Sequence, residues 1–295
     1  FLILSYYSVI AGWTLRYAIA ALGGFSADSG AFFEQVSTGP ASVAWHLIFM
    51  LIAVCIVVGG VNRGIERVSL VLMPLLFVIV CGIAVYAATL PGAGAGYDFY
   101  LSIDMSEVLS LEVLNHAAGQ AFFSLSLGMG AMLTYASYLR EDENLPDESV
   151  IIAVADFGVA FAAGLAVFPL LFALGLDARV GESTVGALFI TLPGAFHEMG
   201  GAGRVVGLLF FVALAVGALT SAISLLEVVV STAIDQLGWS RPLAAIVLGQ
   251  ACALLGLPAA LDIEVLGLMD QVAGNLFLVF GGLMLALFVG WVMPD

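Results

Sequence analysis

The sequence contains no lysine and few charged residues of any kind. Charged side chains make up 10% of its 295 residues, whereas about 25% is usual in a soluble domain. A soluble protein of this size could not cover its core with so few polar side chains, so that class is excluded. Acidic residues number 22 and the net charge is −15, which would repel nucleic acid. Because acid-rich, lysine-free surfaces are typical of salt-loving organisms, we expect a halophilic source.

Enzyme and metal motifs are missing as well. There is no phosphate-binding glycine loop with lysine, which argues against a nucleotide-driven pump, and no Gly-x-Ser-x-Gly or His-Glu-x-x-His motif. The three cysteines lie inside apolar runs without disulfide or metal spacing. His46, His116 and His197 are scattered, and each is expected at an interface or in a loop. We therefore predict no catalytic residues and no enzyme activity.

Long apolar runs are what the sequence has instead. Hydrophobic residues make up 62% of it, and the runs reach the roughly 20 residues that a helix needs to cross the hydrocarbon core. We predict an all-α, multi-pass protein of the cell (cytoplasmic) membrane with about eight transmembrane helices. The predicted spans are 1–22, 41–59, 67–90, 117–139, 149–176, 204–237, 242–260 and 264–292.

The loops and the first residues add two expectations. The chain starts within an apolar run and without an initiator methionine, so we expect a fragment of a longer protein. Arginine sets the orientation of membrane proteins. Four arginines lie in or beside short loops (Arg63, Arg67, Arg140 and Arg241), and two lie by long loops (Arg179 and Arg204). The short loops are therefore predicted to face the cytoplasm, and residues 91–116 to form an extracellular loop.

Asp156 is the first of three polar interruptions in the spans. It lies in an apolar stretch with no other ionisable group. A carboxylate at membrane depth is costly and usually faces a cavity or a partner. It would serve as a cation ligand or a proton carrier; the alternative is a buried carboxyl group satisfied by nearby backbone or hydroxyl donors.

The second interruption covers residues 119–130, where Ser124, Ser126, Gly128 and Gly130 crowd the middle of a span. Glycine weakens a helix, and a broken helix at membrane depth is tolerated where it lines a cavity or is buried in protein. Its free backbone groups could hold an ion or a carboxylate. The alternative is close packing of helices through small residues.

Thr220 and Ser221 form the third interruption. Adjacent hydroxyl groups often only bond back to the preceding turn of their own helix. With Gly217 one turn earlier, however, they could present two hydroxyl oxygens and a carbonyl oxygen to a small hard cation such as sodium.

Four segments together resemble the neurotransmitter:sodium symporter family, in particular its prokaryotic amino-acid transporters. They are YYSVIAGWTL at 6–15, GQAFFSLSLGMG at 119–130 continuing to TYASY at 134–138, LTS at 219–221, and DQVAG at 270–274. They occur in the family's order and with the expected loops. The resemblance implies an inverted-repeat, leucine-transporter-type fold, and it implies that this chain covers family helices three to ten. Residues 1–90 would be the remnant of the first repeat (helices three to five), and 117–295 would be the second repeat (helices six to ten).

The resemblance also implies binding residues. The substrate pocket would be formed by Ile3, Tyr7, Phe123, Ser124, Ser126, Met129, Ser221 and Leu225. Tyr7 would help to fix the substrate carboxylate, and Phe123 would act as an aromatic lid. Ser124 matches a hydroxyl ligand of a first sodium site, where Asp156 stands in place of the asparagine of most members. Gly217, Thr220 and Ser221 match a second site. Each sodium site would be half represented, because the family's helix one supplies the other ligands.

The resemblance also implies which residues form the gates and whether chloride is needed. Asp270 matches the extracellular gate acid, and Asp235 with Tyr138 matches the cytoplasmic gate, with Phe123 as the lid. Ala160 stands where chloride-dependent members have serine, which makes chloride dependence doubtful; Asp156 would supply the fixed negative charge instead.

We therefore predict sodium-coupled symport of an amino acid by alternating access. The apolar residues Ile3, Met129 and Leu225 favour a hydrophobic or aromatic amino acid. The alternative is a channel, or a non-coupled substrate-binding membrane protein on the same scaffold. Expected partners are sodium ions, the amino acid and the lipid bilayer, without nucleic acid, and a homodimer is a candidate assembly.

Overall fold

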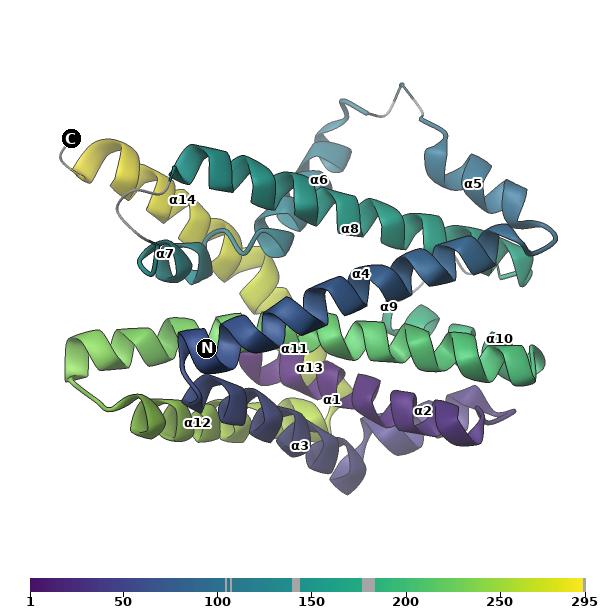
Figure 1. Cartoon of the computed structure of the whole chain (residues 1–295), viewed down its shortest axis with the longest axis horizontal. Helices are drawn as coiled ribbons and strands as arrows, with labels where there is room; N and C mark the ends of the chain where they lie inside the picture. The colour runs from purple at the N-terminus through teal and green to yellow at the C-terminus, as the bar shows by residue number, and fades with distance from the viewer. Residues whose placement is uncertain (104, 107, 140–143, 177–183, 294–295) are drawn as a thin grey trace.

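The structure is a computed structural model that describes residues 1–103, 105–106, 108–139, 144–176 and 184–293. Within these ranges it is helical, without a β-strand (Figure 1). The main helices are α1 (Leu2–Gly23), α2 (Ser29–Ser37), α3 (Gly39–Val58), α4 (Glu66–Ala88), α5 (Ala93–Leu101), α6 (Leu111–Ser124), α7 (Ala131–Ala136), α8 (Leu145–Ala173), α10 (Leu192–Glu198), α11 (Gly201–Leu237), α12 (Arg241–Leu261), α13 (Ile263–Gln271) and α14 (Val279–Leu287). The short helix α9 (Thr184–Gly186) and the π-helical turns η1 (Val61–Ile65), η3 (Ala187–Thr191), η4 (Val272–Leu278) and η5 (Phe288–Val292) complete the path.

Six described helices are long and apolar enough to cross a membrane: α3, α4, α8, α11, α12 and the continuous segment Ile263–Val292. They match six of the eight predicted spans. The predicted span at 1–22 is the 22-residue helix α1, which is not among the six. The span predicted at 117–139 is not one helix, because α6 and α7 are separated by residues 125–130. Of the arginines behind the predicted orientation, Arg140 and Arg179 lie outside the described residues.

Helix α1 lies at the centre of a tightly packed bundle with α3, α11 and α12 (Figure 1). Large aromatic side chains fill the space around it, and Trp13, Tyr17, Phe189 and Phe211 are almost fully buried. The Tyr17 hydroxyl group donates to the Phe189 carbonyl at 2.7 Å. We refer to α1, α3, α11 and α12 as the inner bundle.

Glycines let the helices of the inner bundle approach closely. A Cβ atom on Gly12 would lie 2.7 Å from the Trp45 carbonyl oxygen, so α1 and α3 touch backbone to backbone. His46 is fully buried at the same junction, where its Nδ1 lies 3.0 Å from Ser8 Oγ and its Nε2 lies 2.9 Å from the Ala253 carbonyl oxygen. The expectation that His46 lies at an interface or in a loop was therefore wrong: it connects three packed helices.

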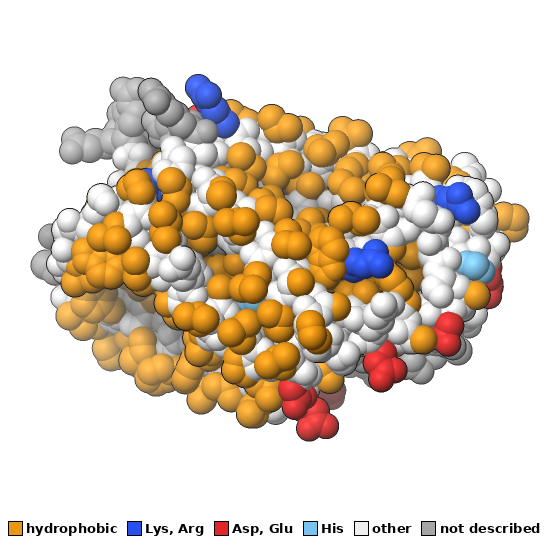
Figure 2. Space-filling model, turned by 90° about the horizontal axis from the view of Figure 1, so that it is seen from below, with side chains coloured by type: hydrophobic (Ala, Val, Ile, Leu, Met, Phe, Trp, Pro, Cys, Tyr) orange, Lys and Arg blue, Asp and Glu red, His pale blue; other side chains and the backbone are white. Residues whose placement is uncertain are grey.

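The remaining helices pack around this bundle and present apolar surface outward. Helix α8 packs against α4 and α5, and α6 packs against η4 and α14. Leu70 and Val71 on α4 and Phe157 on α8 are each about two-thirds exposed. Figure 2 shows hydrophobic side chains spread over much of one face, with the few acidic ones gathered near a margin. An apolar surface of this extent would aggregate in water, and lipid accounts for it.

Candidate functional site

The break between α6 and α7 is produced by three residues in the left-handed region. Ser126 has φ 54°, Gly128 φ 78° and Gly130 φ 81°, and Ser126 is the one non-glycine among the described residues with positive φ. An L-residue adopts this region at a cost, which glycine avoids. The glycines therefore allow the chain to leave the helix after Ser124, and the predicted break is present.

A cavity of about 250 Å³ lies beside the break. All eight residues predicted for the substrate pocket line it, together with Gln120 and Asp156. They come from α1 (Ile3, Tyr7), from α6 and the break (Gln120, Phe123, Ser124, Ser126, Met129), from α8 (Asp156) and from α11 (Ser221, Leu225). Residues more than 200 positions apart are thus gathered around one space, which is lined by both apolar and polar side chains.

Two of the polar lining residues, Ser124 and Asp156, are joined by a hydrogen bond between their side chains. The Ser124 hydroxyl group donates to the Asp156 carboxylate and lies 2.7 Å from Oδ1 and 2.8 Å from Oδ2. Ser124 is also the last residue of α6, where the carbonyl end of a helix carries partial negative charge. Carboxylate and hydroxyl oxygens at one point are ligands suited to a hard cation.

The second predicted cation site is arranged differently. Thr220 is buried, and its hydroxyl group donates to the Gly217 carbonyl at 2.9 Å, within its own helix. Gly217 and Ser221 line a larger apolar cavity of about 410 Å³, which shares Tyr7 and Ser221 with the first cavity. Ser221 therefore lines both cavities. The Thr220 hydroxyl group instead bonds to the preceding turn of its own helix, which was the alternative to cation binding in the sequence analysis.

Asp270, the predicted outer gate acid, is exposed on α13. The hydroxyl group of Tyr6 is buried without a hydrogen-bond partner among the described residues. It lies within electrostatic range of the Asp270 carboxylate, although the two do not reach hydrogen-bond geometry. Phe123, the predicted lid, is 38% exposed at the cavity.

At the predicted inner gate, Tyr138 contacts a residue that the sequence analysis did not select. Its hydroxyl group donates to Glu227 Oε1 at 2.6 Å, and Arg241 Nη1 donates to Glu227 Oε2 at 2.7 Å. Glu227 is fully buried. Asp235 is exposed at the end of α11, and no hydrogen bond between described residues joins it to Tyr138. Tyr138 and Asp235 as a gate pair therefore stays a prediction.

Glu227 could have been found in the sequence. It is the one acidic residue within the apolar run 205–234, and an isolated acid in a span generally has a nearby partner. The same reasoning was applied to Asp156 but not to this position. The partners themselves are 89 residues before it and 14 after it, so only the fold reveals them.

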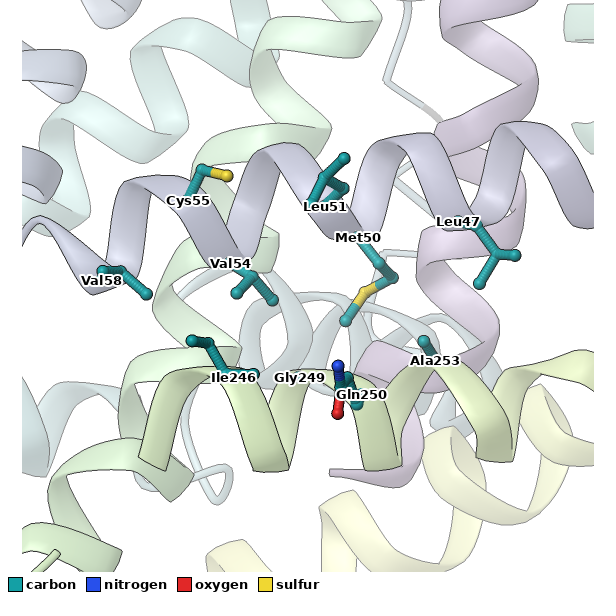
Figure 3. Close-up of a pocket in the computed structure, with 10 residues that line it drawn as sticks. All are labelled: Leu47, Met50, Leu51, Val54, Cys55, Val58, Ile246, Gly249, Gln250 and Ala253. Carbon is teal, nitrogen blue, oxygen red and sulfur yellow. The ribbon is translucent and has the colours of Figure 1, made fainter. Parts of the chain in front are cut away.

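A third cavity, of about 480 Å³, lies on the outer side of the inner bundle between α3 and α12 (Figure 3). Its lining is apolar except for Gln250, and Leu51 on its rim is 63% exposed. It contains no charged group and lies on two membrane-spanning helices. It can therefore accommodate only apolar groups, and it is not the polar site at the broken helix.

Comparisons with known proteins agree with this geometry. A sequence model of the Sodium:neurotransmitter symporter family matches residues 33–294. An uncharacterized sodium-dependent transporter of Bacillus subtilis, YhdH, is 35% identical over 98% of this chain and 67% of its own length. Sodium-dependent nutrient amino acid transporter 1 of Drosophila melanogaster is 29% identical over 67% of this chain and 31% of its own length.

A solved structure gives the fold comparison. The crystal structure of MhsT in complex with L-phenylalanine superposes with a TM-score of 0.86 at 40% identity. It covers 99% of this chain, and this chain covers 70% of MhsT. At this level of similarity the predicted inverted-repeat, leucine-transporter-type fold is confirmed.

Proposed function

This chain belongs to the Sodium:neurotransmitter symporter family, and we propose that it carries out sodium-coupled symport of a hydrophobic or aromatic amino acid as part of a complete transporter. Family membership makes it a multi-pass protein of the cell membrane and a sodium-dependent transporter, not an enzyme. The chain spans about two-thirds of the length of YhdH and MhsT, and the proposal concerns the complete product of the gene that contains this sequence.

The contact between Ser124 and Asp156 supports the proposal most directly. It places a carboxylate and a hydroxyl oxygen at the carbonyl end of α6, on the wall of the cavity. We assign this point to the first sodium ion, and the Gly217, Thr220 and Ser221 region to the second. Asp156 also provides a fixed negative charge, which would make chloride unnecessary.

The shape and lining of the cavity support the choice of substrate. Its lining includes Ile3, Met129 and Leu225, which are all apolar. In this proposal the substrate side chain lies against these three residues, and the Tyr7 hydroxyl group contacts the substrate carboxylate. L-phenylalanine is the ligand in the MhsT crystal structure, and it is our first candidate substrate.

The assignment of repeats is also proposed. Residues 1–90 would belong to the first repeat, 91–116 would form an outer loop, and 117–295 would form the second repeat. The break at 125–130 would then lie in the first helix of the second repeat. This is the position where inverted-repeat transporters place discontinuous helices beside their substrate.

Uptake of labelled phenylalanine into proteoliposomes containing the complete gene product tests the function. We expect uptake in sodium and none when choline replaces it, and uptake that is unchanged in choline would refute sodium coupling. Asp156→Asn should raise the sodium concentration for half-maximal uptake by about tenfold, the equivalent of about 1.4 kcal/mol of lost binding. Asp147→Asn is the matched control, since Asp147 lies on the same helix and is exposed. A flattened pH dependence in Asp156→Asn would identify Asp156 as a proton carrier instead.

A channel or a non-coupled binding protein is the alternative function. In a symporter, sodium and substrate must raise each other's affinity by the same factor, because coupling free energy is reciprocal. Sodium binding measured with and without phenylalanine separates the two functions. The same sodium affinity in both conditions would favour the alternative.

A further inference from the structure

Helix α14 touches the broken segment through two adjacent glycines, backbone to backbone. A Cβ atom on Gly281 would lie 2.8 Å from the Gly128 carbonyl oxygen. A Cβ atom on Gly128 would lie 2.7 Å from the Gly282 amide nitrogen and 2.8 Å from the Leu278 carbonyl oxygen. At distances this short no side chain fits without moving one of the two backbones.

The close approach explains why glycine is present here. Gly281 and Gly282 lie inside α14 and do not have positive φ, so their backbone conformation does not require glycine. Glycine also weakens a helix interior relative to alanine. Other glycines of the same continuous segment, Gly267 and Gly290, have nothing within 4 Å of an added Cβ atom. The pair at 281–282 thus coincides with the place where α14 meets the break.

The residues held by this contact border the substrate cavity. Ser126 and Met129 flank Gly128 and both line the cavity. Ser126 is two residues before Gly128 and Met129 follows it, so a displacement of Gly128 would move residues that line a space of only about 250 Å³. The Phe122 ring lies against Gly282.

We propose that Gly281 and Gly282 are positioning residues that set the depth of the substrate cavity, and with it the preference for large over small amino acids. The inference rests on the proposed function. It adds that selectivity depends on a helix that supplies no side chain to the cavity lining. With alanine at 281 the break shifts inward, so the pocket becomes shallower and large side chains are disfavoured.

Competition by phenylalanine and by alanine against labelled substrate measures this preference in the complete gene product. Gly281→Ala should lower the preference for phenylalanine by about tenfold or more, because a single methylene in an apolar pocket changes selectivity by about 10–200-fold. Gly290→Ala, the control on the same segment, should keep the wild-type ratio. Gly281→Ala with the ratio of Gly290→Ala would overturn the inference, although the proposed function would stand.

A compensating substitution distinguishes positioning from general damage. The nearest neighbour of an alanine Cβ at 282 is the flexible Phe122 ring, so Phe122→Leu should restore part of the phenylalanine preference of Gly282→Ala. The same change should not restore Gly281→Ala, whose obstacle is the Gly128 carbonyl. Equal rescue of both variants, or of neither, would contradict the assigned contacts.

A chemical measurement tests the geometry without transport. In a background with Cys55, Cys81 and Cys252 changed to serine, Ser126→Cys places a thiol in the cavity wall. Adding Gly281→Ala should slow its reaction with a small water-soluble thiol reagent, while adding Gly290→Ala should not. Equal reaction rates with and without Gly281→Ala would overturn the inference, whether or not the wild-type protein transports phenylalanine. Absence of transport by the wild-type protein would refute the proposed function separately.

Discussion

Polar groups are placed differently in the inner bundle and in the region around the broken helix. In the inner bundle they hydrogen-bond between packed helices, whereas around the break they line a cavity. In the inner bundle, Trp13 Nε1 donates to Ser42 Oγ at 3.0 Å, and His46 bridges Ser8 and Ala253. Around the break, the Ser124–Asp156 contact borders a cavity. Burial differs as well: 61% of an apolar 18-residue stretch of α11 is buried inside the protein, against 6% of the corresponding stretch of α8.

This difference indicates where movement is expected. Close-packed helices with satisfied polar groups have one low-energy arrangement, because packed interiors do not deform continuously. The α6–α7 break has few such contacts and three residues in the left-handed region. We therefore expect the inner bundle to stay fixed while the broken-helix region moves during transport. Three variants test the comparison, in order of decreasing effect.

The largest effect is expected at Glu227, a charged residue of the inner bundle that accepts a hydrogen bond from Tyr138 in the broken-helix region. Glu227 is on α11 of the inner bundle, and its carboxylate binds both Tyr138 and Arg241. Glu227→Ala leaves Arg241 without its partner, which should lower the free energy of unfolding by about 3–5 kcal/mol. Denaturant unfolding in micelles measures it. Asp235→Ala, an exposed position on the same helix, should change stability by about 0.5 kcal/mol or less; equal losses in the two variants would show that the regions are not joined here.

A smaller loss is expected inside the bundle. His46→Ala removes the links to Ser8 and Ala253 and leaves a void, which should cost about 1–3 kcal/mol of unfolding free energy. Because His46 does not line the cavity, the folded fraction should bind sodium with wild-type affinity. His197→Ala is the comparison. The His197 ring is exposed, and its Nδ1 lies 2.7 Å from the Phe25 carbonyl oxygen, where water can take its place. A change in sodium affinity in His46→Ala would mean that the bundle is not mechanically separate from the site.

The smallest effect concerns Thr220, which belongs to the bundle by packing and to the proposed second sodium site by position. Thr220→Val keeps the shape but removes the hydroxyl group, and it should weaken sodium activation of uptake by about fivefold, close to 1 kcal/mol. Thr232→Val is the comparison, because the exposed Thr232 hydroxyl also bonds back within the same helix, to the Val228 carbonyl four residues earlier. Identical sodium dependence in the two variants would show that the Thr220 hydroxyl group only bonds back to its own helix and does not bind sodium.

Much of the fold was predictable because lipid imposes a simple rule. Six predicted spans match helices that can cross a membrane, since apolar length is enough to identify a span. The other two predicted spans, 1–22 and 117–139, do not correspond to a single long apolar helix of this kind. Helix α1 is packed on several sides, so it carries buried serines such as Ser5 and Ser8, and the span at 117–139 is divided by the left-handed residues at 126–130.

The candidate site was predictable in its residues but not in its contacts. Ser124 and Asp156 were each selected as costly polar residues in apolar spans, and the structure brings them to 2.7 Å. Glu227 was overlooked, and Tyr138 was assigned to Asp235, because a periodic pattern does not say which distant side chains meet. Both sodium sites, the substrate-binding residues, the gates, the halophilic source and the homodimer stay predictions.

The sequence by itself determined that this protein crosses lipid many times, and which polar groups are too costly to be there without a role. These properties depend on local composition, which lipid selects one segment at a time. Only the tertiary structure decided the pairing of Ser124 with Asp156, the burial of Glu227 between Tyr138 and Arg241, and the seating of Gly128 on Gly281 and Gly282. Those contacts join segments that are far apart in the chain, and their positions are set by packing of whole helices, not by the residues next to them.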